Sequence, residues 1–408
     1  MSTARNIVIV GAGPAGVGAA LAARQQDPAA NILLVTDEHC EPYEKPPLSK
    51  AVLTGKAAPQ DAPIAGPRGV AAHKVTLKTG THCAAIDRGG RAVLTAAGER
   101  IPYDALVLAT GSINRVLPLF PAGQSGIHYL RTEREALALR QALTRSRTLL
   151  VIGAGLIGLE AAASAAELGI KTTVLEVAPR IMARVCDAET SAMVQARHAA
   201  GGVDIRLGVA IAGVRALPEG GIAVETKTET FTADLVVVGI GVAPNDQLAE
   251  AAGLAVQDGI MVDDHGFTSD RTILAAGDCT RFPGPGSTVR LENWRHAQEH
   301  GATAGRNAAG GDAVYNVTPS FWSEQFDLYI QGMGWPVPQP SAQVRRQIGA
   351  NALMRFDLDG DRIAYALGIN AQRDIAAARR LIERRVAVGL ADLADPSKPL
   401  AGMLKAKA

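Results

Sequence analysis

The sequence predicts an α/β protein with two nested nucleotide-binding domains and a smaller α+β domain at its C-terminal end. Three observations lead to this prediction. A glycine-rich turn joins a strand to a helix near residue 11, the same pattern returns near residue 153, and a small antiparallel sheet is indicated after about residue 319. A chain of 408 residues also exceeds what one hydrophobic core usually supports, so several domains are expected.

Composition limits the functions that are open to the protein. Hydrophobic residues make up 47% and charged residues 20%, the balance of a globular protein rather than a disordered one. The formal net charge of +1 lacks the basic excess typical of nucleic-acid-binding proteins, so no nucleic-acid partner is expected. Met1–Asn6 is too short to hold the apolar core of a secretory signal, and no apolar run approaches the roughly 20 residues that cross a bilayer.

The cysteines carry information about the compartment. Cys40, Cys83, Cys186 and Cys279 are widely spaced, and no two of them have CxxC spacing. This spacing argues against a zinc knuckle or a local redox disulfide, and it fits an environment that keeps thiols reduced. We therefore predict a cytoplasmic protein with no membrane association.

The first glycine-rich turn lies in the full context of a dinucleotide-binding fingerprint. A buried strand leads into the turn, a helix of small residues follows, and a second strand ends at an acidic residue. These elements are expected at residues 6–10, 11–16, 15–25, 31–36 and 37. The order of strand, GxGxxG turn, helix, strand and acid predicts nucleotide binding far more strongly than the glycines alone.

Each residue of this fingerprint has a physical role. Gly11 makes the tight turn, Gly13 lets the backbone approach a pyrophosphate, and Gly16 lets helix and strand pack closely. The helix N-terminus stabilises the phosphate charge. Asp37 is expected to accept hydrogen bonds from ribose hydroxyls.

The same pattern returns over residues 148–176. The strand, turn, helix, second strand and acid are expected at 149–152, 153–158, 156–168, 172–175 and 176. Two fingerprints in one chain predict two dinucleotides, and the natural pair is a flavin held permanently and a nicotinamide that comes and goes.

Glu176 indicates which nicotinamide is used. Its carboxylate should bind a free 2′-hydroxyl and repel a 2′-phosphate, and Val177 and Ala178, which follow it, cannot receive a phosphate. NADH is therefore favoured over NADPH. Arg180 and Arg184 lie a few residues further on, so the strength of the preference stays open.

The order of the remaining buried strands predicts that one domain is inserted in the other. Strands are expected within 103–111, 233–241 and 272–278, each closing on a small-residue turn. We therefore predict two nested Rossmann-like nucleotide-binding domains. The predicted bounds are 1–114 with 246–318 for the first, 115–245 for the inserted second, and 319–408 for the C-terminal α+β domain.

Several motifs accompany the two fingerprints. The most specific is Pro42-Tyr43-Glu44-Lys45-Pro46-Pro47-Leu48-Ser49-Lys50, and the others are 108–111, 129–132, 239–242 with 244–245, 276–278, 290–292 and 321–325. Together they cover nearly the whole chain and resemble the ferredoxin reductases of bacterial oxygenase systems, which are glutathione-reductase-like flavoproteins. The sequence departs from the family pattern at Lys45 and Glu41, where arginine is usual, and at Asn114, where proline is common.

The resemblance implies a fold, an activity and partners. It implies a glutathione-reductase-like fold with FAD in the first domain and NADH in the second. It also implies hydride transfer from NADH to FAD, followed by single-electron transfers to a [2Fe–2S] ferredoxin that feeds an aromatic-ring dioxygenase or a cytochrome P450. Such an enzyme belongs to aromatic hydrocarbon catabolism.

The resemblance also implies site residues. Lys50 would sit at the flavin ring, Cys83 near the adenine, Asp278 at the ribityl chain, and the Trp294 backbone N–H near the pyrimidine end of the flavin. The full set for FAD is Gly11, Gly13, Ala15, Gly16, Asp37, Lys50, Cys83, Ala109, Thr110, Gly111, Arg131, Gly277, Asp278 and Trp294. The set for NADH is Gly153, Gly155, Ile157, Gly158, Glu176, Arg184, Gly239, Ile240 and Gly241.

Lys50 and Glu160 are the predicted catalytic residues. A cation near flavin N5 would favour hydride arrival and the negative charge of reduced flavin, and Pro46 and Pro47 stiffen the approach to Lys50. By the resemblance, Glu160 pairs with this lysine. The structural alternatives are a surface lysine and a glutamate that the helix dipole favours. Because hydride transfer needs position and electrostatics, no histidine is expected to act as an acid or base.

Three other patterns have structural interpretations. His296-Ala297-Gln298-Glu299-His300 matches a zinc-peptidase motif but has no recognisable third ligand, so no metal site is predicted. Residues 357–361 hint at a calcium loop, but the glycine is misplaced, and the segment is predicted to be a hairpin turn. Disulfide or peroxide chemistry is disfavoured because Lys50 takes the place of the family's redox cysteine, and Cys40 lies ten residues earlier.

The C-terminal domain is expected to dock the protein partner. A helix is predicted over 374–388, with Gly389 as its stop. Its arginines, among them Arg379, Arg380 and Arg384, could steer an acidic ferredoxin, although a solvated helix face is an equal alternative. By the resemblance, Trp322 lies near the exposed flavin edge.

Other functions stay open at the level of sequence. A rubredoxin reductase or an NADH oxidase would share the flavin chemistry and differ in the electron acceptor. An FAD-binding signalling protein that resembles the apoptosis-inducing factors is a further alternative, but such proteins carry extra targeting segments and basic surfaces, which are not evident in this sequence.

Overall fold

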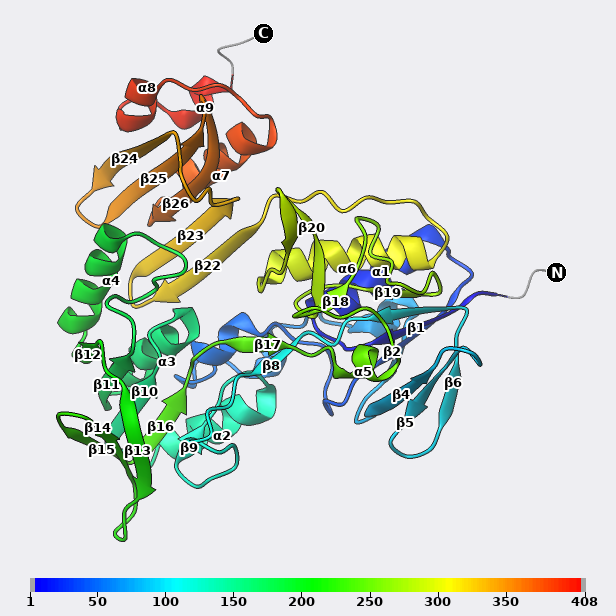
Figure 1. Cartoon of the computed structure of the whole chain (residues 1–408), viewed down its shortest axis with the longest axis horizontal. Helices are drawn as coiled ribbons and strands as arrows, with labels where there is room; N and C mark the ends of the chain where they lie inside the picture. The colour runs from blue at the N-terminus through cyan, green and yellow to red at the C-terminus, as the bar shows by residue number, and fades with distance from the viewer. Residues whose placement is uncertain (1–3, 405–408) are drawn as a thin grey trace. The chain divides into compact units, whose positions relative to one another are not determined.

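A computed structural model describes residues 4–404, so residues 1–3 of the predicted first domain and 405–408 of the predicted third lie outside it. The chain forms two compact units (Figure 1). The first unit comprises the chain up to Glu44, Gln60–Ile113 and Val242–Pro319, and the second comprises Lys45–Pro59, Asn114–Gly241 and the chain from Ser320. In residues 4–404, no helix is long and apolar enough to span a bilayer.

The first unit is organised around a five-stranded parallel sheet. Apart from the edge strand at residues 76–78, its strands are largely buried on both faces, which explains why they are short continuous apolar runs rather than alternating ones. In spatial order they are β19 (Ile273–Ala275), β7 (Ala105–Leu108), β1 (Asn6–Val10), β2 (Asn31–Val35) and β3 (Thr76–Lys78). The fingerprint elements are confirmed, and helix α1 (Pro14–Gln26) starts one residue earlier than predicted because Pro14 suits the first turn.

Helices α1 and α6 (Trp294–Ala308) lie side by side in this unit (Figure 1). A Cβ at Gly301 would overlap the carbonyl of Ala15, and one at Gly305 would overlap that of Ala19. Four residues further along α6, from Gly301 to Gly305, the contact also moves four residues forward along α1, from Ala15 to Ala19, so the two helices run parallel. Glycines at these positions therefore allow backbone-to-backbone packing, which brings both helix N-termini to the same end of the unit.

Smaller elements complete the first unit. They include three antiparallel pairings between consecutive strands and a parallel pairing of β18 with β20. The strands are β4 (Cys83–Asp87), β5 (Ala92–Thr95), β6 (Arg100–Pro102), β17 (Val242–Pro244), β18 (Ile260–Met261), β20 (Thr280–Gly284) and β21 (Ser287–Val289), and β17 pairs with β8 (Ser112–Asn114). The short helices are η2 (Pro59–Asp61), η3 (Val70–His73) and α5 (Gln247–Ala251).

The second unit contains a second five-stranded parallel sheet. In spatial order its strands are β12 (Val203–Leu207), β11 (Lys171–Glu176), β10 (Thr148–Ile152), β16 (Leu235–Val238) and β9 (Ile127–His128). Its helices are α2 (Glu133–Leu143), α3 (Leu156–Glu167) and α4 (Ala188–Ala200), with η1 (Pro46–Ser49) packed against α2 and α3. An antiparallel sheet of β13 (Ile211–Ala216), β14 (Ile222–Thr226) and β15 (Thr230–Ala233) accompanies them.

An antiparallel sheet and three helices make up the C-terminal part of this unit. The strands, in spatial order, are β22 (Ser320–Gln325), β23 (Leu328–Gly334), β26 (Arg362–Ile369), β25 (Ala352–Asp359) and β24 (Ala342–Gly349). Helix α7 (Gln372–Glu383) packs on β23 and β26, and α8 (Leu390–Ala394) and α9 (Leu400–Met403) follow. The hairpin predicted at 357–361 is confirmed, with Gly360 in the left-handed conformation at φ 62°.

One helix boundary was predicted wrongly. The helix expected over 374–388 ends at Glu383, because Arg385 turns into the left-handed region at φ 51°. The chain then pairs back onto the sheet through a bridge between Arg362 and Ala387. Gly389 is the N-cap of α8 rather than the stop of α7, and Arg384 lies just beyond the helix.

The predicted α/β class is confirmed, with two nucleotide-binding sheets, one interrupting the other along the chain, and a C-terminal α+β part. The segment Lys45–Pro59, which carries Lys50, belongs to the second unit, although the predicted first domain spanned it. The remaining domain bounds stay a prediction.

The packing of α1 on α6 makes a testable prediction. Gly305→Ala should lower the free energy of unfolding by about 2–3 kcal/mol, because its methyl group would overlap the Ala19 backbone. Gly402→Ala is the matched control, since no atom of residues 4–404 lies within 4 Å of its added Cβ, and helix propensity should make it neutral or stabilising. Denaturant unfolding of the three proteins measures both effects, and equal midpoints for Gly305→Ala and the parent would contradict the packing argument.

Candidate active site

The carboxyl ends of three strands meet at one edge of the first unit's sheet. Val10 is in register with Leu108, and Leu108 is in register with Ala275. The residues that follow these strands include most of the predicted FAD contacts, namely Gly11, Gly13, Ala15, Gly16, Ala109, Thr110, Gly111, Gly277 and Asp278. This edge is where open α/β sheets bind their ligands.

The turn after β1 forms a cradle that fits a pyrophosphate. A Cβ at Gly11 would overlap the carbonyl of Ala109, and one at Gly16 would overlap the carbonyl of Gly11, so both positions require glycine. Around Gly13, in contrast, no atom of residues 4–404 comes within 4 Å of the place that a Cβ would occupy. The backbone there is open to an approaching phosphate, as the fingerprint requires.

Two helix N-termini point to this edge. Helix α1 begins at Pro14, beside the cradle, and α6 begins at Trp294 with Asn293 as its N-cap. The parallel packing places the N-terminus of α6 roughly 10 Å beyond that of α1 along the common axis. The edge therefore offers two separate sites of partial positive charge, which suits a long anionic cofactor.

Asp37 and Cys83 mark the adenosine end of the predicted site. Asp37 is exposed just after β2, and Cys83 is buried at the start of β4. Burial, together with the nearby Asp37 carboxylate, raises the pKa of the Cys83 thiol to about 11. The two residues are thus neighbours, and the thiol is protonated at neutral pH.

Hydrogen bonds hold the strand ends in place. Ser112 Oγ donates to Asp278 Oδ2 at 3.1 Å, and Thr110 Oγ1 donates to the Asn245 carbonyl at 2.5 Å. Asn245 Nδ2 returns a bond to the Thr110 carbonyl at 3.3 Å. Ser112 was not predicted, because its role depends on a residue 166 positions away in the chain.

His296 and His300 belong to a buried aromatic cluster. Their rings pack with Phe282 and Tyr315, and the closest ring pair, His300 and Tyr315, has centroids 4.6 Å apart. His296 Nδ1 is hydrogen-bonded to the Tyr315 hydroxyl at 2.7 Å. Burial lowers the pKa of His296 to about 4, so this imidazole is neutral at pH 7.

The second unit repeats the cradle. Ile152 is in register with Val238 and with Leu175, so Gly153 and Gly239 follow at the same edge. A Cβ at Gly153 would lie 2.6 Å from the Gly239 carbonyl oxygen, and one at Gly158 would overlap the carbonyl of Gly153. Gly155 resembles Gly13, with no atom of the described chain within 4 Å of an added Cβ. Both cradles therefore have room for a phosphate at the same place in the fingerprint.

The first turn of α3 and the residues that follow β16 provide further predicted NADH contacts. Ile157 is 48% exposed in that turn, and Gly241 has a left-handed φ of 103°. The Arg184 guanidinium lies 3.4 Å from the place of a Gly241 Cβ, so Arg184, Ile240 and Gly241 are close to one another.

Glu176 and Arg180 differ in what they can offer a nucleotide. The Glu176 carboxylate accepts bonds from the backbone N–H groups of Ala154 at 2.6 Å and Ala178 at 2.8 Å, which fixes it beside the cradle. Arg180 donates to the carbonyls of Cys186 at 2.5 Å and Ala183 at 2.9 Å, so it braces its own loop. Arg184 is exposed and lies near the cradle.

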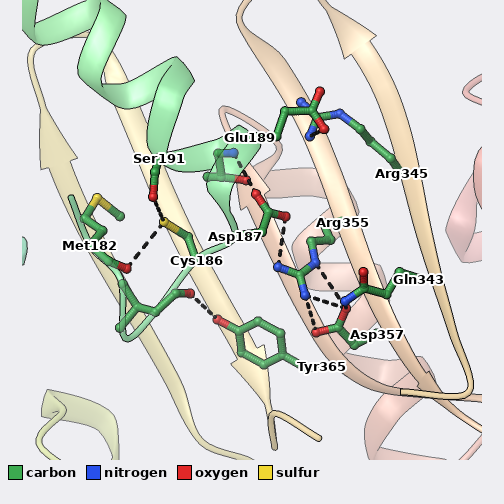
Figure 2. Close-up of polar contacts among 12 residues, drawn as sticks. Met182, Cys186, Asp187, Glu189, Ser191, Gln343, Arg345, Arg355, Asp357 and Tyr365 are labelled. Carbon is green, nitrogen blue, oxygen red and sulfur yellow. Dashed lines mark hydrogen bonds and ion pairs between the residues drawn. The ribbon is translucent and has the colours of Figure 1, made fainter. Parts of the chain in front are cut away.

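The loop between β11 and α4 (residues 177–187) is fastened to the C-terminal sheet (Figure 2). Asp187 caps α4 by accepting from Thr190 N at 2.7 Å, and it pairs with Arg355 of β25 at 2.9 Å. Arg355 also pairs with the buried Asp357 at 2.8 Å. Tyr365 of β26 donates to the Val185 carbonyl at 3.2 Å. The conformation of the loop that follows Glu176 therefore depends on the C-terminal sheet.

Lys50 and Glu160, the predicted catalytic pair, are brought together. Lys50 ends η1 with its side chain 18% exposed, and its Nζ lies 3.4 Å from Oε2 of Glu160, whose side chain is 4% exposed. Ser49 donates to the same Oε2, and Ser323 Oγ donates to Oε1 at 2.7 Å. Ser164, one turn after Glu160 on α3, donates to the Ser49 carbonyl at 2.8 Å and holds η1 against that helix.

Ser49 and Ser323 had no predicted role, although both lie in motifs noted in the sequence.

Lys45 and Asn114, where the sequence departs from the family pattern, also make contacts in the second unit. Lys45 donates to the Arg131 carbonyl at 3.4 Å, and Asn114 donates to Glu135 at 3.2 Å. Arg131, predicted to contact FAD, thus lies in the second unit with Lys50.

The predicted docking residues are spread over the C-terminal part. Trp322 lies on β22, and α7 turns its apolar residues toward the sheet. Arg379 is paired with Glu383 at 2.7 Å, whereas Arg380 and Arg384 are exposed. Among the three predicted docking arginines, Arg380 and Arg384 are therefore the more exposed, and the nearby Arg373 and Arg385 are exposed as well.

Comparisons with known proteins agree with this geometry. Residues 5–301 match the family model of pyridine nucleotide-disulphide oxidoreductases, and residues 320–404 match that of the reductase C-terminal domain. The anthranilate 1,2-dioxygenase system ferredoxin–NAD(+) reductase component of Burkholderia cepacia is 40% identical over 96% of this chain and 97% of that protein. A rubredoxin–NAD(+) reductase of Ectopseudomonas oleovorans is 37% identical over 80% of this chain and 86% of its own.

A solved structure gives the same result for the fold. The covalent putidaredoxin reductase–putidaredoxin complex contains a chain that is 35% identical, with a TM-score of 0.93 over 99% of both chains. The expected resemblance, the glutathione-reductase-like fold and the expected class of enzyme, an oxidoreductase, are confirmed.

Because Asp187 helps to fasten the 177–187 loop, we expect its charge to contribute to the free energy of unfolding in a way that depends on pH. Burial raises the pKa of Asp187, but the bonds from Thr190 and the charge of Arg355 outweigh it and hold the pKa below its ordinary value. A depressed pKa contributes stability that is present above the unfolded value of about 3.9 and is lost as the pH falls through the folded value.

Asp187→Asn keeps the N-cap and removes only the charge. It should cost about 1 kcal/mol of unfolding free energy at pH 7 and clearly less near pH 3, as urea unfolding across this pH range would measure. A deficit of the same size at both pH values would mean that the aspartate acts through packing rather than charge.

Proposed function

The chain belongs to the pyridine nucleotide-disulphide oxidoreductase family, and from this premise we propose that it is an NADH-dependent ferredoxin reductase. Family membership implies FAD and a pyridine nucleotide, NAD(P)(H). Bound FAD would accept a hydride from NADH and pass single electrons to a [2Fe–2S] ferredoxin that serves an aromatic-ring dioxygenase or a cytochrome P450. The observation that supports this proposal best is the pair of equivalent glycine cradles, one in each unit.

We assign FAD to the first unit. The open backbone at Gly13 and the N-terminus of α1 would hold the pyrophosphate, and Asp37 would accept bonds from the ribose. Asp278, which accepts a hydrogen bond from Ser112, would bind the ribityl chain. The second helix N-terminus, at Trp294, would stabilise negative charge on the reduced flavin.

We assign NADH to the second unit, in preference to NADPH. Glu176 is held beside the cradle, where it would accept a bond from a free 2′-hydroxyl and repel a 2′-phosphate. Arg180 is occupied by the carbonyls of its own loop, so it offers little to a phosphate. Arg184 is exposed and would contact the pyrophosphate or the ribose.

We propose that Lys50 and Glu160 support hydride transfer. Lys50 supplies a cation that favours the arrival of negative charge, and the Glu160 carboxylate keeps the ammonium in place. The remaining residues of the site bind and orient, which is what hydride transfer requires. No side chain needs to take up or release a proton for this step.

Ferredoxin is the favoured acceptor, with rubredoxin as the second candidate. The relative named for ferredoxin matches 96% of this chain, whereas the one named for rubredoxin matches 80%. The proposed docking residues are Arg379, Arg380 and Arg384, because ferredoxins are acidic, together with Trp322.

We also propose a cytoplasmic location. It is supported by the finding that none of the four cysteines, all of them in the described chain, forms a disulfide.

The proposal is tested by anaerobic stopped-flow spectroscopy of the purified yellow protein. Flavin absorbance should bleach rapidly with NADH and much more slowly with NADPH. The reduced protein should then pass electrons quickly to an oxidised [2Fe–2S] ferredoxin, and slowly to rubredoxin or oxygen. Fast reoxidation by oxygen without ferredoxin reduction would instead identify an oxidase and refute the proposal.

Lys50→Met tests the catalytic assignment. The variant should retain FAD but reduce the limiting rate of flavin reduction by NADH roughly a hundredfold, because a fixed charge near the reaction is lost. Lys56→Met is the matched control, since Lys56 pairs with Glu167 at 3.1 Å on the exposed surface of the same unit. Unchanged reduction kinetics in Lys50→Met would remove Lys50 from the mechanism.

A further inference from the structure

We propose that Ser323 and Gln325, on the buried face of β22, are positioning residues that orient the Glu160 carboxylate, and that His198 sets their hydrogen bonds. The inference rests on the proposed function, because it acts through Glu160. It extends the site from the parallel sheet of the second unit to the C-terminal sheet of the same unit.

The alternation of β22 separates two kinds of residue. Ser323 and Gln325 are two positions apart, so they share one face of the strand, and both have 0% exposure. Trp322 and Glu324 take the opposite face. Serine and glutamine are unusual at fully buried positions unless their polar groups are satisfied.

These buried groups form a chain with one consistent direction. His198 Nε2 is 2.8 Å from Gln325 Oε1, Gln325 Nε2 donates to Ser323 Oγ at 3.0 Å, and Ser323 Oγ donates to Glu160 Oε1 at 2.7 Å. The hydroxyl of Ser323 receives the amide proton, so its own proton is directed to the carboxylate. The two middle groups, Gln325 and Ser323, therefore each have one donor role and one acceptor role.

His198 determines which way the glutamine amide faces. Burial lowers the pKa of His198, which favours a neutral imidazole at pH 7, and the tautomer with its proton on Nε2 is the one that donates to the amide oxygen. A reversed amide would place its NH₂ group against that N–H and turn its oxygen to Ser323. The serine proton would then be drawn away from Glu160.

The strand that presents Ser323 is anchored independently of Glu160. The β22–β23 turn places Phe326 against the end of α4, where a Cβ on Gly201 would lie within 3 Å of its ring atoms. The Arg197 guanidinium lies 4.4 Å above that ring and pairs with Asp327. The donor is thus held in place before the carboxylate meets it, as positioning requires.

The two carboxylate oxygens of Glu160 have different partners. Ser49 and Lys50 bind Oε2, whereas Ser323 binds Oε1. Without Ser323, Oε1 would lose this donor in a site where Glu160 is 3% exposed. The carboxylate would rotate toward other donors, and the contact with Lys50, already 3.4 Å long, would be the first to weaken.

The test uses the full-length, FAD-loaded protein with Ser323→Ala, Glu160→Gln and the double variant. Ser323→Ala should slow the limiting rate of flavin reduction by NADH about tenfold, the effect of one lost bond to a charged group. The dissociation constant of NAD⁺, measured by calorimetry on the oxidised protein, and the FAD content should not change. In the Glu160→Gln background the serine substitution should have no further effect on the rate.

Ser341→Ala is the control variant. Ser341 donates to the Leu358 and Gly360 carbonyls in the same sheet, so its loss reports on general loosening of that sheet. If Ser323→Ala does not fold, Gln325→Met provides the second variant. It keeps the length of the side chain, removes the donor to Ser323, and should slow reduction in the same direction by a smaller factor.

Two patterns would overturn the inference, and they differ from failure of the proposed function. A parental rate in Ser323→Ala together with a slow Glu160→Gln would refute positioning while leaving Glu160 in the mechanism. An equal slowing by Ser323→Ala in both backgrounds would mean that the serine acts by another route. A parental rate in Glu160→Gln itself would refute the assignment of Glu160, and with it this inference.

Discussion

The second unit is assembled around a carboxylate that burial makes costly. Glu160 is 3% exposed in α3, and a charge in such a place is tolerated only when cations and hydrogen-bond donors compensate it. Its donors Ser49, Lys50 and Ser323 are 111, 110 and 163 residues away in the chain. Satisfying this one group therefore requires that the Lys45–Pro59 segment, the second parallel sheet and the C-terminal sheet converge.

The two glycine cradles are determined by a different constraint. In each of them a helix lies so close to the strand before it that only glycine fits. Gly16 and Gly158 occupy equivalent positions, and a side chain at either would overlap the first glycine of its own turn. Gly13 and Gly155 leave equivalent open space. The first unit adds the N-terminus of α6 beside that of α1, an arrangement suited to a cofactor that stays bound.

Besides its proposed docking role, the C-terminal sheet holds other parts of the second unit in place. Arg355 and Tyr365 fasten the 177–187 loop, which follows Glu176, the acid that is proposed to select the nucleotide. Ser323 reaches Glu160 from the same sheet. Because β22 also carries Trp322 on its other face, the strand that is proposed to receive a partner is the one that binds Glu160, the proposed catalytic carboxylate.

Local order was what the sequence alone could determine. Strand, glycine turn, helix and terminal acid are set by hydrophobic runs and by steric needs within about 30 residues, so both fingerprints and the α/β class were predictable. The end of α7 was not, because a bridge between Arg362 and Ala387 redirects the chain after Glu383. Lys50 and Glu160 were paired by resemblance alone. Ser323, Gln325 and His198 acquire their roles only in the tertiary structure, since a buried hydrogen bond joins residues that no local pattern relates.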